Sequence, residues 1–377
     1  MNRERVPLGK YVKEYSVRNK DNEDIPVYSV TNSQGFCTEY FGKEVASNDK
    51  TTYKIVPRGF FAYNPSRINV GSVDWQRCED RVIVSPLYNV FSVSDKLDCQ
   101  YLYYFLKSDF AKQMIKSKAS GSVRDNLKLE MLKEITIPDV PVEDQRFCAN
   151  ILDHLQLVIE LRKKQLQQLD SLIQSRFVEM FGSIHESTKY PYIAVKDLTD
   201  VISGGTPNRK KAEYWKNGTI PWVKTTELQN KIITDVDEYI TEEGLAGSSA
   251  KMAPVGTVLV AMYGQGKTRG MTAYLGIEAS TNQACACILP SDKIDSMFMW
   301  KYFELSYDKL RSLAQGAGQP NINGNIIKNF PVLVPPIDLQ NDYVAFVTQT
   351  AKSKAAIQHS LDETQVLFDS LMQKYFG

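Results

Sequence analysis

Residues 170–177 read Asp-Ser-Leu-Ile-Gln-Ser-Arg-Phe, and residues 369–376 read Asp-Ser-Leu-Met-Gln-Lys-Tyr-Phe. The two segments are separated by 199 residues, which is slightly more than half of the 377-residue chain. An internal repeat determines the organisation of a whole fold, because each copy then forms a comparable structural unit. This match therefore predicts a chain built from two similar halves.

Further matches follow in the same order in both halves, at offsets between 195 and 198 residues. Five ordered matches at a nearly constant offset are not expected by chance, so each half is predicted to be a globular unit followed by a long helix. The other four pairs are Pro141–Gln145 with Pro336–Gln340, Gly121–Asn126 with Gly318–Asn323, Tyr104–Phe105 with Tyr302–Phe303, and Pro57–Gly59 with Pro254–Gly256.

Two segments without proline or glycine run from Glu143 to about Met180 and from Asp338 to Phe376. Good helix formers dominate both, so each predicts a helix of about 38 residues, roughly 57 Å long. Apolar residues recur at alternating three- and four-residue steps, which is the spacing of a coiled-coil seam. We expect the two helices to pair within the chain; pairing with another protein or in a dimer is the alternative. The predicted seam residues are Leu155, Ile159, Leu166, Leu169, Ile173, Val347, Ile357, Leu361, Phe368 and Leu371.

Each globular unit is predicted to mix strands and helices. Segments rich in β-forming residues alternate with glycine-containing turns, and one aromatic helix is expected to end each unit. The predicted strands are Gly59–Tyr63 and Val82–Val84, followed by Leu87–Val93, in the first half and Ile220–Val223, Thr257–Met262 and Ala284–Leu289 in the second, and the predicted aromatic helices are Gln100–Lys116 and Met297–Ala314.

The predicted fold class is α+β, a tandem repeat of two mixed α/β domains, each followed by a long helix. In chain order, residues 1–140 form the first domain, 141–182 the first long helix, 183–335 the second domain and 336–377 the second long helix.

Composition is that of an ordinary globular protein, with 43% hydrophobic and 24% charged residues. No apolar run approaches the about 18 residues of a membrane span, and the N-terminus has no signal-peptide pattern, so a cytoplasmic protein without membrane contact is expected. The net charge of +1 neither indicates nor excludes a nucleic-acid partner, because local patches matter more than the sum. Six cysteines without Cys-x-x-Cys spacing predict reduced thiols and no zinc site.

Catalytic motifs are incomplete wherever the chain approaches them. The Asp/Asn-Pro-Pro-aromatic loop of adenine methyltransferases is broken at its third position in Asn64–Arg67 and in Ser85–Tyr88. A phosphate-binding loop ending in Gly266-Lys267-Thr268 would need glycine at position 261, which is Ala261. The three histidines, at 154, 185 and 359, form no recognisable triad pattern. A binding role without catalysis, metal or cofactor in this chain is therefore favoured.

Motifs at both ends of the second half carry a family resemblance. Ser203-Gly-Gly-Thr-Pro207, Tyr214-Trp215 and Gly218-Thr-Ile-Pro-Trp222 stand at its start, and Gly318-Gln-Pro-Asn-Ile-Asn323 precedes the helix at its end. This ordered set resembles the target-recognition domain of type I restriction–modification specificity subunits. The first half departs from the pattern, since it lacks Gly-Gly-Thr-Pro and Ile-Pro-Trp and has Gly121-Ser-Val-Arg124 in place of Gly-Gln-Pro-Asn. Its membership depends on the repeat, and its divergence fits two domains that read different sequences.

The resemblance implies two recognition domains joined to an antiparallel coiled-coil pair of long helices. It further implies a bipartite, asymmetric target in double-stranded DNA and two methyltransferase subunits that modify adenine with S-adenosylmethionine. Restriction and translocation would belong to a further subunit. This chain would then be the non-catalytic specificity subunit, and a rigid helix pair would suit two half-sites at a fixed spacing.

Loops that follow the Pro-x-Gly strands are the first candidates for DNA contact. Their glycines allow close backbone approach, their cations suit phosphate or guanine, and their amides suit adenine. The segment after Ile-Pro-Trp is a further candidate, and the cationic loop Arg209–Lys211 is expected to contact phosphate where it meets DNA; an ordinary solvated loop is the alternative for each. Trp215, Trp222 and Trp300 are expected in the core rather than stacked on bases. The predicted contacts are Asn64, Arg67, Asn69 and Arg124 in the first half and Arg209, Lys210, Lys224, Thr225, Gln265, Lys267, Thr268 and Arg269 in the second.

The sequence leaves two other functions open. A fragment of a fused restriction–modification enzyme would need a methyltransferase region in the same polypeptide, and the expectation of a complete chain, from Met1 to the second long helix, speaks against it. A helical scaffold with two protein-binding lobes would show no salt-dependent DNA binding, whereas a complex that contacts phosphates must show it.

Overall fold

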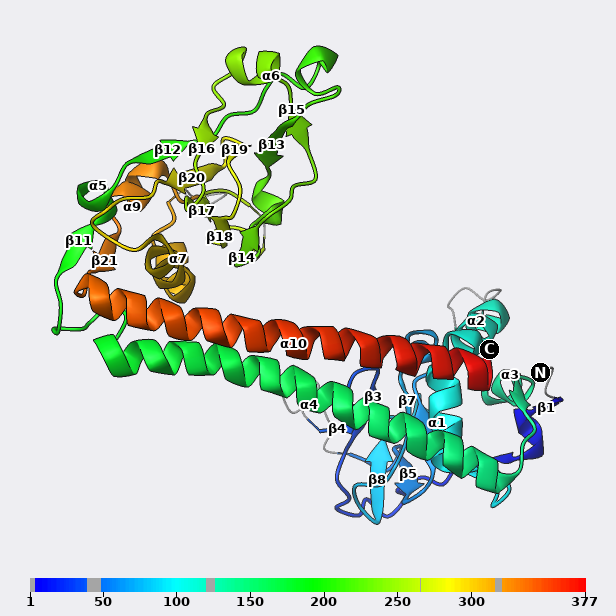
Figure 1. Ribbon diagram of the computed structural model, residues 1–377. Coiled ribbons are helices and arrows are strands. Elements are labelled where there is room, and N and C mark those ends of the chain that lie inside the picture. The colour runs from blue at the N-terminus through cyan, green and yellow to red at the C-terminus, as the bar shows by residue number, and fades with distance from the viewer. Residues whose placement is uncertain (1–3, 39–48, 120–125, 265, 316–320) are drawn as a thin grey trace. The chain divides into compact units, whose positions relative to one another are not determined.

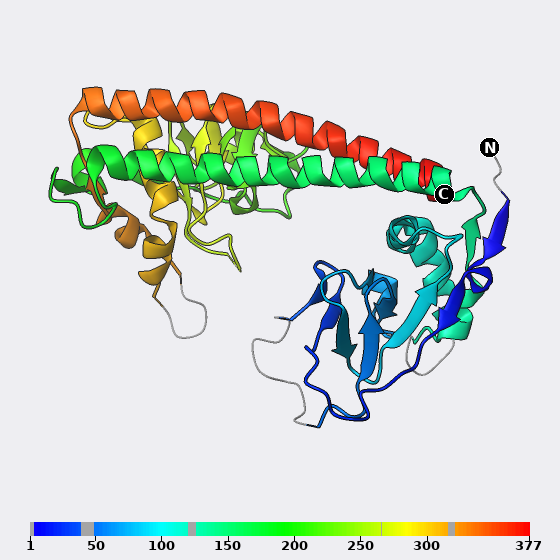
Figure 2. The ribbon, with the colours of Figure 1, turned by 90° about the horizontal axis from the view of Figure 1, so that it is seen from below.

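Figures 1 and 2 show the computed structural model, which describes residues 4–38, 49–119, 126–264, 266–315 and 321–377. The chain forms two compact units. Residues 1–164 and 357–377 make up the first unit, and residues 165–356 make up the second. Each long helix is therefore divided between the two units. The boundaries at residues 140, 182 and 335 that the sequence suggests stay predictions.

A four-stranded antiparallel sheet, in the order β2–β9–β6–β7, forms the centre of the first unit. Phe61 of β6 and Phe91 of β9 are fully buried, and their rings stack with centroids 5.1 Å apart. The strands are β1 (Arg5–Pro7), β2 (Val12–Glu14), β3 (Ser29–Thr31), β4 (Gly35–Cys37), β5 (Lys54–Pro57), β6 (Phe61–Tyr63), β7 (Val73–Trp75), β8 (Arg81–Val84), β9 (Asn89–Val93) and β10 (Thr136–Pro138), and the helices are α1 (Cys99–Lys107), α2 (Asp109–Ala119) and α3 (Leu129–Lys133).

The described residues of the second unit form two larger sheets and one two-stranded sheet, β11–β21. A five-stranded sheet has the order β12–β20–β17–β18–β14, and a four-stranded sheet has the order β15–β13–β19–β16. Pairing is antiparallel except between β14 and β18 and between β13 and β19. The strands are β11 (Tyr192–Ala194), β12 (Val201–Ser203), β13 (Ile220–Val223), β14 (Lys231–Ile233), β15 (Tyr239–Ile240), β16 (Met252–Ala253), β17 (Val258–Ala261), β18 (Thr272–Leu275), β19 (Ala279–Thr281), β20 (Cys285–Ile288) and β21 (Pro331–Leu333), and the helices are α5 (Val195–Leu198), α6 (Glu242–Ala246), α7 (Ser296–Leu305), α8 (Tyr307–Ser312) and α9 (Gly324–Lys328).

The repeat is visible in how each unit closes. β1 pairs antiparallel with β10 just before the first long helix, and β11 pairs antiparallel with β21 just before the second. Gly59 and Gly256, which are equivalent in the repeat, both have a left-handed backbone, with φ of 85° and 88°. The predicted α+β class with a tandem repeat is confirmed.

The prediction of one aromatic helix at the end of each unit is wrong. The chain forms two helices in each case, α1 and α2 in the first unit and α7 and α8 in the second, with breaks at Ser108 and Ser306. At the first break the Ser108 hydroxyl accepts a hydrogen bond from the Ala111 N–H at 3.2 Å. A serine in this position caps the start of a new helix, because it satisfies an N–H group that has no partner inside the helix.

The two long helices are α4 (Val142–Phe181) and α10 (Ile337–Phe376), each of 40 residues (Figure 1). Cross-helix contacts fix their direction. In the first unit Arg162 donates hydrogen bonds to Ser360 and Thr364, and in the second Lys354 forms an ion pair with Asp170. Residue numbers rise along α4 while those of their partners fall along α10, so the pair is antiparallel, as predicted. No described helix is long and apolar enough to cross a membrane.

The predicted seam of the helix pair avoids solvent. All ten seam residues are buried or partly buried, and Ile159, Val347 and Leu361 are the most enclosed. Other large apolar residues of α4 and α10 are exposed, so the enclosed ones follow the predicted spacing rather than hydrophobicity alone. These exposed residues are Phe147, Leu157, Leu161, Val366 and Leu367 in the first unit and Leu172, Val178 and Ile337 in the second.

Each long helix ends in the core of the unit formed by the other half of the sequence. Phe177 near the end of α4 is fully buried in the second unit, where its ring lies 5.5 Å from that of Tyr343. Phe376 at the end of α10 is fully buried in the first unit, where its ring lies 5.0 Å from that of Tyr101. These two phenylalanines occupy equivalent places in the repeat. The segment that defines the repeat is therefore the segment that anchors each helix.

Candidate nucleic-acid interface

The loop between β17 and β18 carries four of the predicted contacts, and its described part is fixed against α8. Tyr307 Oη donates a hydrogen bond to the carbonyl oxygen of Lys267 over 2.8 Å. The Arg311 guanidinium donates to the carbonyl oxygen of Arg269 over 2.7 Å. Because both bonds hold backbone atoms, the loop is positioned without using the side chain of Lys267, which is exposed.

Glycine is required at the start of this loop. Gly264 has a φ of 144°, and a Cβ atom there would lie 2.7 Å from Thr268 Cβ, closer than real Cβ atoms approach. Thr268 itself is partly buried, as is Arg269, so Lys267 is the most exposed of the three described candidates. Gln265, the fourth predicted contact, lies outside the described residues.

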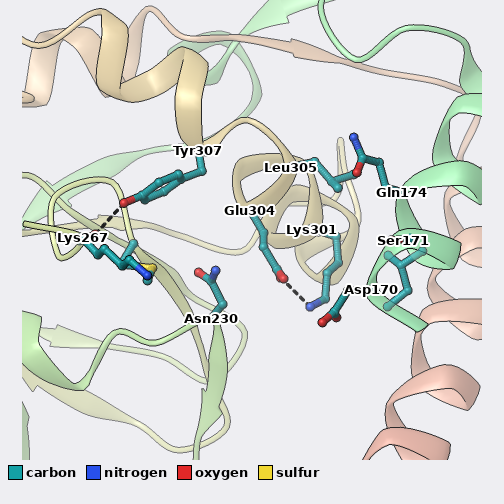
Figure 3. A pocket seen from close by; sticks show the side chains of 11 residues that line it. Asp170, Ser171, Gln174, Asn230, Lys267, Lys301, Glu304, Leu305 and Tyr307 are labelled. Atoms are coloured by element: carbon teal, nitrogen blue, oxygen red, sulfur yellow. Dashed lines mark hydrogen bonds and ion pairs between the residues drawn. The ribbon is translucent and has the colours of Figure 1, made fainter. Parts of the chain in front are cut away.

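A cavity of about 480 Å³ lies beside the Lys267 loop within the second unit (Figure 3). Both carboxylates in its wall are ion-paired: Glu304 with Lys301 at 2.6 Å, and Asp170 with Lys354. Lys267 has no ion pair among the described residues. The ammonium group of Lys267 can therefore bind an anion such as a backbone phosphate, whereas that of Lys301 is already paired with Glu304.

Asn230, also in the cavity wall, was not predicted from the sequence. Its Oδ1 atom accepts hydrogen bonds from the Thr272 N–H at 3.1 Å and the Thr272 hydroxyl at 2.9 Å. The Trp300 indole donates to the same hydroxyl at 3.0 Å. Trp300 is therefore a buried structural residue, as expected, and it helps to hold an amide side chain in place beside Lys267 (Figure 3).

Arg209 and Lys224, predicted as separate contacts, meet at one carboxylate. Glu238 forms ion pairs with Arg209 and, at 3.1 Å, with Lys224. Lys224 also contacts Asp237 at 3.3 Å. The hydrogen bond to Glu238 raises the pKa of Lys224. Burial pushes the pKa of Glu238 upward, but hydrogen bonds from both cations outweigh it, and that pKa lies below its ordinary value.

Two further predicted residues of the second unit have ordinary loop surroundings. Lys210 is exposed, and its backbone N–H donates to Asn208 Oδ1 at 3.0 Å. Thr225 begins the short 3₁₀ helix Thr225–Glu227 and is partly buried. Neither belongs to the cluster around Glu238, and their assignment to DNA stays a prediction.

The predicted contacts of the first unit lie in the turn after β6. Asn64 Oδ1 accepts a hydrogen bond from the Ser66 N–H at 3.0 Å, which shapes the turn itself. Arg67 is exposed at the start of the 3₁₀ helix Ile68–Val70, and Asn69 is partly buried within it. Arg124 lies outside the described residues.

A second polar turn of the first unit, which was not predicted from the sequence, is fixed beside this one. The Lys107 ammonium donates hydrogen bonds to the carbonyl oxygens of Gly71 and Asn32, so the β3–β4 turn lies next to the turn after β6. Buried Asp74 holds the same hairpin through the Phe36 N–H at 3.2 Å. Burial raises the pKa of the Asp74 carboxyl and lowers the pKa of Lys107.

The described residues contain six free cysteines and no candidate metal cluster. No group of three or more His, Cys, Asp or Glu side chains there is arranged to hold a metal ion. The six cysteines, all of them described, are free thiols. Burial raises the pKa of Cys287 to about 11, so this thiol is protonated near neutral pH.

Comparisons with known proteins agree with this organisation. The family model for the type I restriction modification DNA specificity domain matches twice, at residues 8–171 and 188–364. The specificity subunit of the Escherichia coli type I restriction enzyme EcoR124I/EcoR124II is 26% identical over 368 residues, which cover 90% of this chain and 84% of that protein.

Two solved structures share the fold. The S subunit of a type I restriction–modification system from M. genitalium has a TM-score of 0.61 and 15% identity, over 100% of this chain and 96% of that one. A chain from a structural study of complex assembly and conformational transition in a type I R-M system has a TM-score of 0.60 and 17% identity, over 99% and 97%.

Proposed function

The chain belongs to the type I restriction modification DNA specificity family, and we propose that it reads a bipartite, asymmetric target in double-stranded DNA. It is a type I specificity subunit with two target-recognition domains. The observation that carries the proposal is the duplication itself. Two separate units of one chain, with different residues in their candidate loops, suit two different half-sites.

Catalysis is assigned to partner subunits in this proposal. Two methyltransferase subunits would bind the chain, hold S-adenosylmethionine and modify adenine, while restriction and translocation would reside in a further subunit. The chain would supply recognition alone. This division agrees with the incomplete catalytic motifs of its sequence.

Exposed apolar residues on the long helices are the proposed docking places for the methyltransferase subunits. The largest exposed apolar side chains of a soluble protein commonly mark interaction surfaces when they are grouped. Leu157 and Leu161 lie one helical turn apart on the face of α4 opposite its seam, with more than half of each residue's surface exposed. Exposed apolar helix residues occur in both units, which suits one partner for each.

Lys267→Ala is expected to weaken DNA binding by the complex with its methyltransferase subunits. A lysine that neutralises one phosphate releases counterions on binding, so its loss should reduce the slope of log K against log salt by about 1. The measurement is a binding titration over a range of salt concentrations, using DNA that carries the recognised sequence. Sequence preference should change less than overall affinity.

The matched control for this experiment is Lys196→Ala. Lys196 is an exposed lysine on α5 of the same unit, and α5 carries no predicted contact. Its ammonium group donates a hydrogen bond to Asn329 Oδ1 at 2.8 Å. The Lys196→Ala variant removes the same charge as Lys267→Ala and should leave the salt slope unchanged. Equal affinity and equal slope for wild type and Lys267→Ala would remove the β17–β18 loop from the DNA site.

A further inference from the structure

We propose that Arg209 and Glu238 of the second recognition domain together read one G·C base pair, the guanidinium contacting guanine and the carboxylate accepting from the cytosine amino group. The inference rests on the proposed function and adds a base identity and a residue, Glu238, to the site. It follows from how the chain places a donor and an acceptor side by side on a fixed platform.

The platform is the segment that leads to Arg209. The Trp222 indole donates a hydrogen bond to the carbonyl oxygen of Gly205 at 2.9 Å, and the Trp215 indole donates to that of Asn208 at 3.2 Å. A Cβ atom at Gly205 would lie 2.3 Å from the backbone nitrogen of Ala250, so only glycine lets this segment lie so close. The tryptophans and glycines of the motif thus hold the backbone that presents Arg209.

The Arg209 guanidinium lies over these same tryptophans. Its Cζ atom is 3.6 Å from the ring centroid of Trp215 and 4.8 Å from that of Trp222. A guanidinium on an aromatic face is held by the cation–π interaction while its N–H groups point outward from its edges. Half of the Arg209 side-chain surface is exposed. The fork of donors is therefore oriented before any ligand arrives, which limits the entropy lost on binding.

Glu238 is held beside this fork by contacts of its own. The backbone N–H of Trp222 donates a hydrogen bond to the backbone carbonyl oxygen of Glu238 at 3.0 Å. The buried carboxylate of Glu227 accepts from the backbone N–H groups of Lys224 at 2.7 Å and Asp237 at 3.1 Å, so it ties together the two segments that bring Lys224 and Glu238 into contact. Arg209 and Lys224 both bond to the Glu238 carboxylate, whose side chain keeps 29% of its surface exposed.

Donor and acceptor match the major-groove edge of G·C. Guanine presents the acceptors N7 and O6 there, and cytosine presents the donor N4. Arginine is suited to the two guanine acceptors, and glutamate to the cytosine donor. In an A·T pair the adenine N6 donor lies between two acceptors, adenine N7 and thymine O4. The second guanidinium donor would then face the N6 donor, and the carboxylate would face the O4 acceptor. The pair Arg209–Glu238 thus favours G·C in one orientation.

The test uses the complex of this chain with its methyltransferase subunits and a set of target DNAs in which each base pair of the half-site read by residues 183–335 is varied. Relative binding of each DNA is measured for wild type, Glu238→Gln and Arg209→Lys. We expect wild type to require G·C at one position. Both variants should lose about 5- to 150-fold of the preference at that same position and keep the other positions.

Asp237→Asn is the matched control, because Asp237 contacts Lys224 but forms no ion pair with Arg209 among the described residues. It should leave all preferences unchanged. Hydrogen exchange of β13 and β15 reports whether a variant keeps the local fold. If Glu238→Gln does not fold, Arg209→Lys still tests the inference, because it retains the positive charge and removes only the guanidinium.

Two results overturn the inference alone: unchanged preference in both folded variants, or changes at two different positions. A wild-type complex without any base preference in this half-site would contradict the proposed function as well.

Discussion

Replacing Phe376 with alanine is expected to lower the free energy of unfolding of the first unit by about 3–5 kcal/mol. The ring is fully buried at the end of α10, with centroids 5.0 Å from Tyr101 and 5.9 Å from Phe105, so its loss leaves a cavity among aromatic side chains. Hydrogen exchange of the α1 amides measures the effect, since they report opening of this unit. A loss of 3 kcal/mol corresponds to opening that is on the order of a hundredfold more frequent.

Leu367→Ala provides the control for the Phe376 variant. Leu367 lies on the same helix in the same unit but is about half exposed, so its truncation should cost no more than about 0.5 kcal/mol. Exchange of the β17 and β20 amides in the second unit should not respond to either change. If Phe376→Ala left α1 exchange at the wild-type rate, the helix end would not anchor the unit as described.

Replacing Leu157 and Leu161 together with glutamate is expected to prevent stable binding of a methyltransferase subunit. Each change would place a carboxylate in a contact that the proposal assigns to apolar surface. A single hot-spot residue at the centre of an interface contributes at least about 2 kcal/mol, and such contributions do not simply add. Taking one such loss as the lower limit, affinity should fall by at least about thirtyfold. Sedimentation of the co-expressed subunits measures how much complex remains.

Lys163→Glu adds a carboxylate to the same helix away from the Leu157–Leu161 face. Lys163 is exposed and lies toward the flank of the seam, so the complex should sediment as wild type does. A double leucine variant that assembles as well as this control would show that the partner binds elsewhere on the chain. The two leucines are already exposed, so the variant should retain its fold.

The long helices were predictable because their stability is encoded locally and repeatedly. Forty residues without proline or glycine leave few alternatives to a helix, and the spacing of the apolar residues predicts which face of the helix is buried. The sequence could not show where the helix ends belong. From the sequence, Phe177 and Phe376 are expected only to lie in the last turns of the two long helices. In the structure each is buried in the core that the other half of the sequence forms.

The spacing of apolar residues could not predict the break in each aromatic helix. Serine is tolerated within helices as well as at their starts, so Ser108 and Ser306 gave no distinct signal. Their equivalence in the repeat was the available clue, since both occupy the position three residues after the matched Tyr-Phe pair. A serine that recurs at matched sites suggests a structural role that a single occurrence does not.

The candidate site was only partly predictable, for a physical reason. Arg209 and Lys224 could be chosen by residue type and motif, but Glu238 stands in the acidic run Asp235–Glu238, which resembles a solvated loop. Pairing of β13 with β15 brings this run back beside the Ile-Pro-Trp segment. Contacts that depend on such long-range register leave no trace in local composition.

The first unit shows the same limit more strongly. Its loop after β6 was chosen by analogy with the second half, and its position beside the β3–β4 turn depends on Lys107, a residue of the aromatic helix α1. A lysine near the end of a helix is ordinarily solvated, so the sequence favoured no such role. The divergence of this half from the family motifs removed the other source of information.

In the proposed function the two units of this chain each specify one half of a split DNA target. Single-molecule sequencing of host DNA, after co-expression with the methyltransferase partner, maps the methylated adenines and so reveals both halves of that target. The wild-type chain is compared with one in which residues 183–335 are exchanged for those of a related subunit. We predict a bipartite motif in which one half changes and the other half is retained. A motif that does not change with the exchange, or an absence of modified adenines despite an active methyltransferase, would show that this chain does not specify the target.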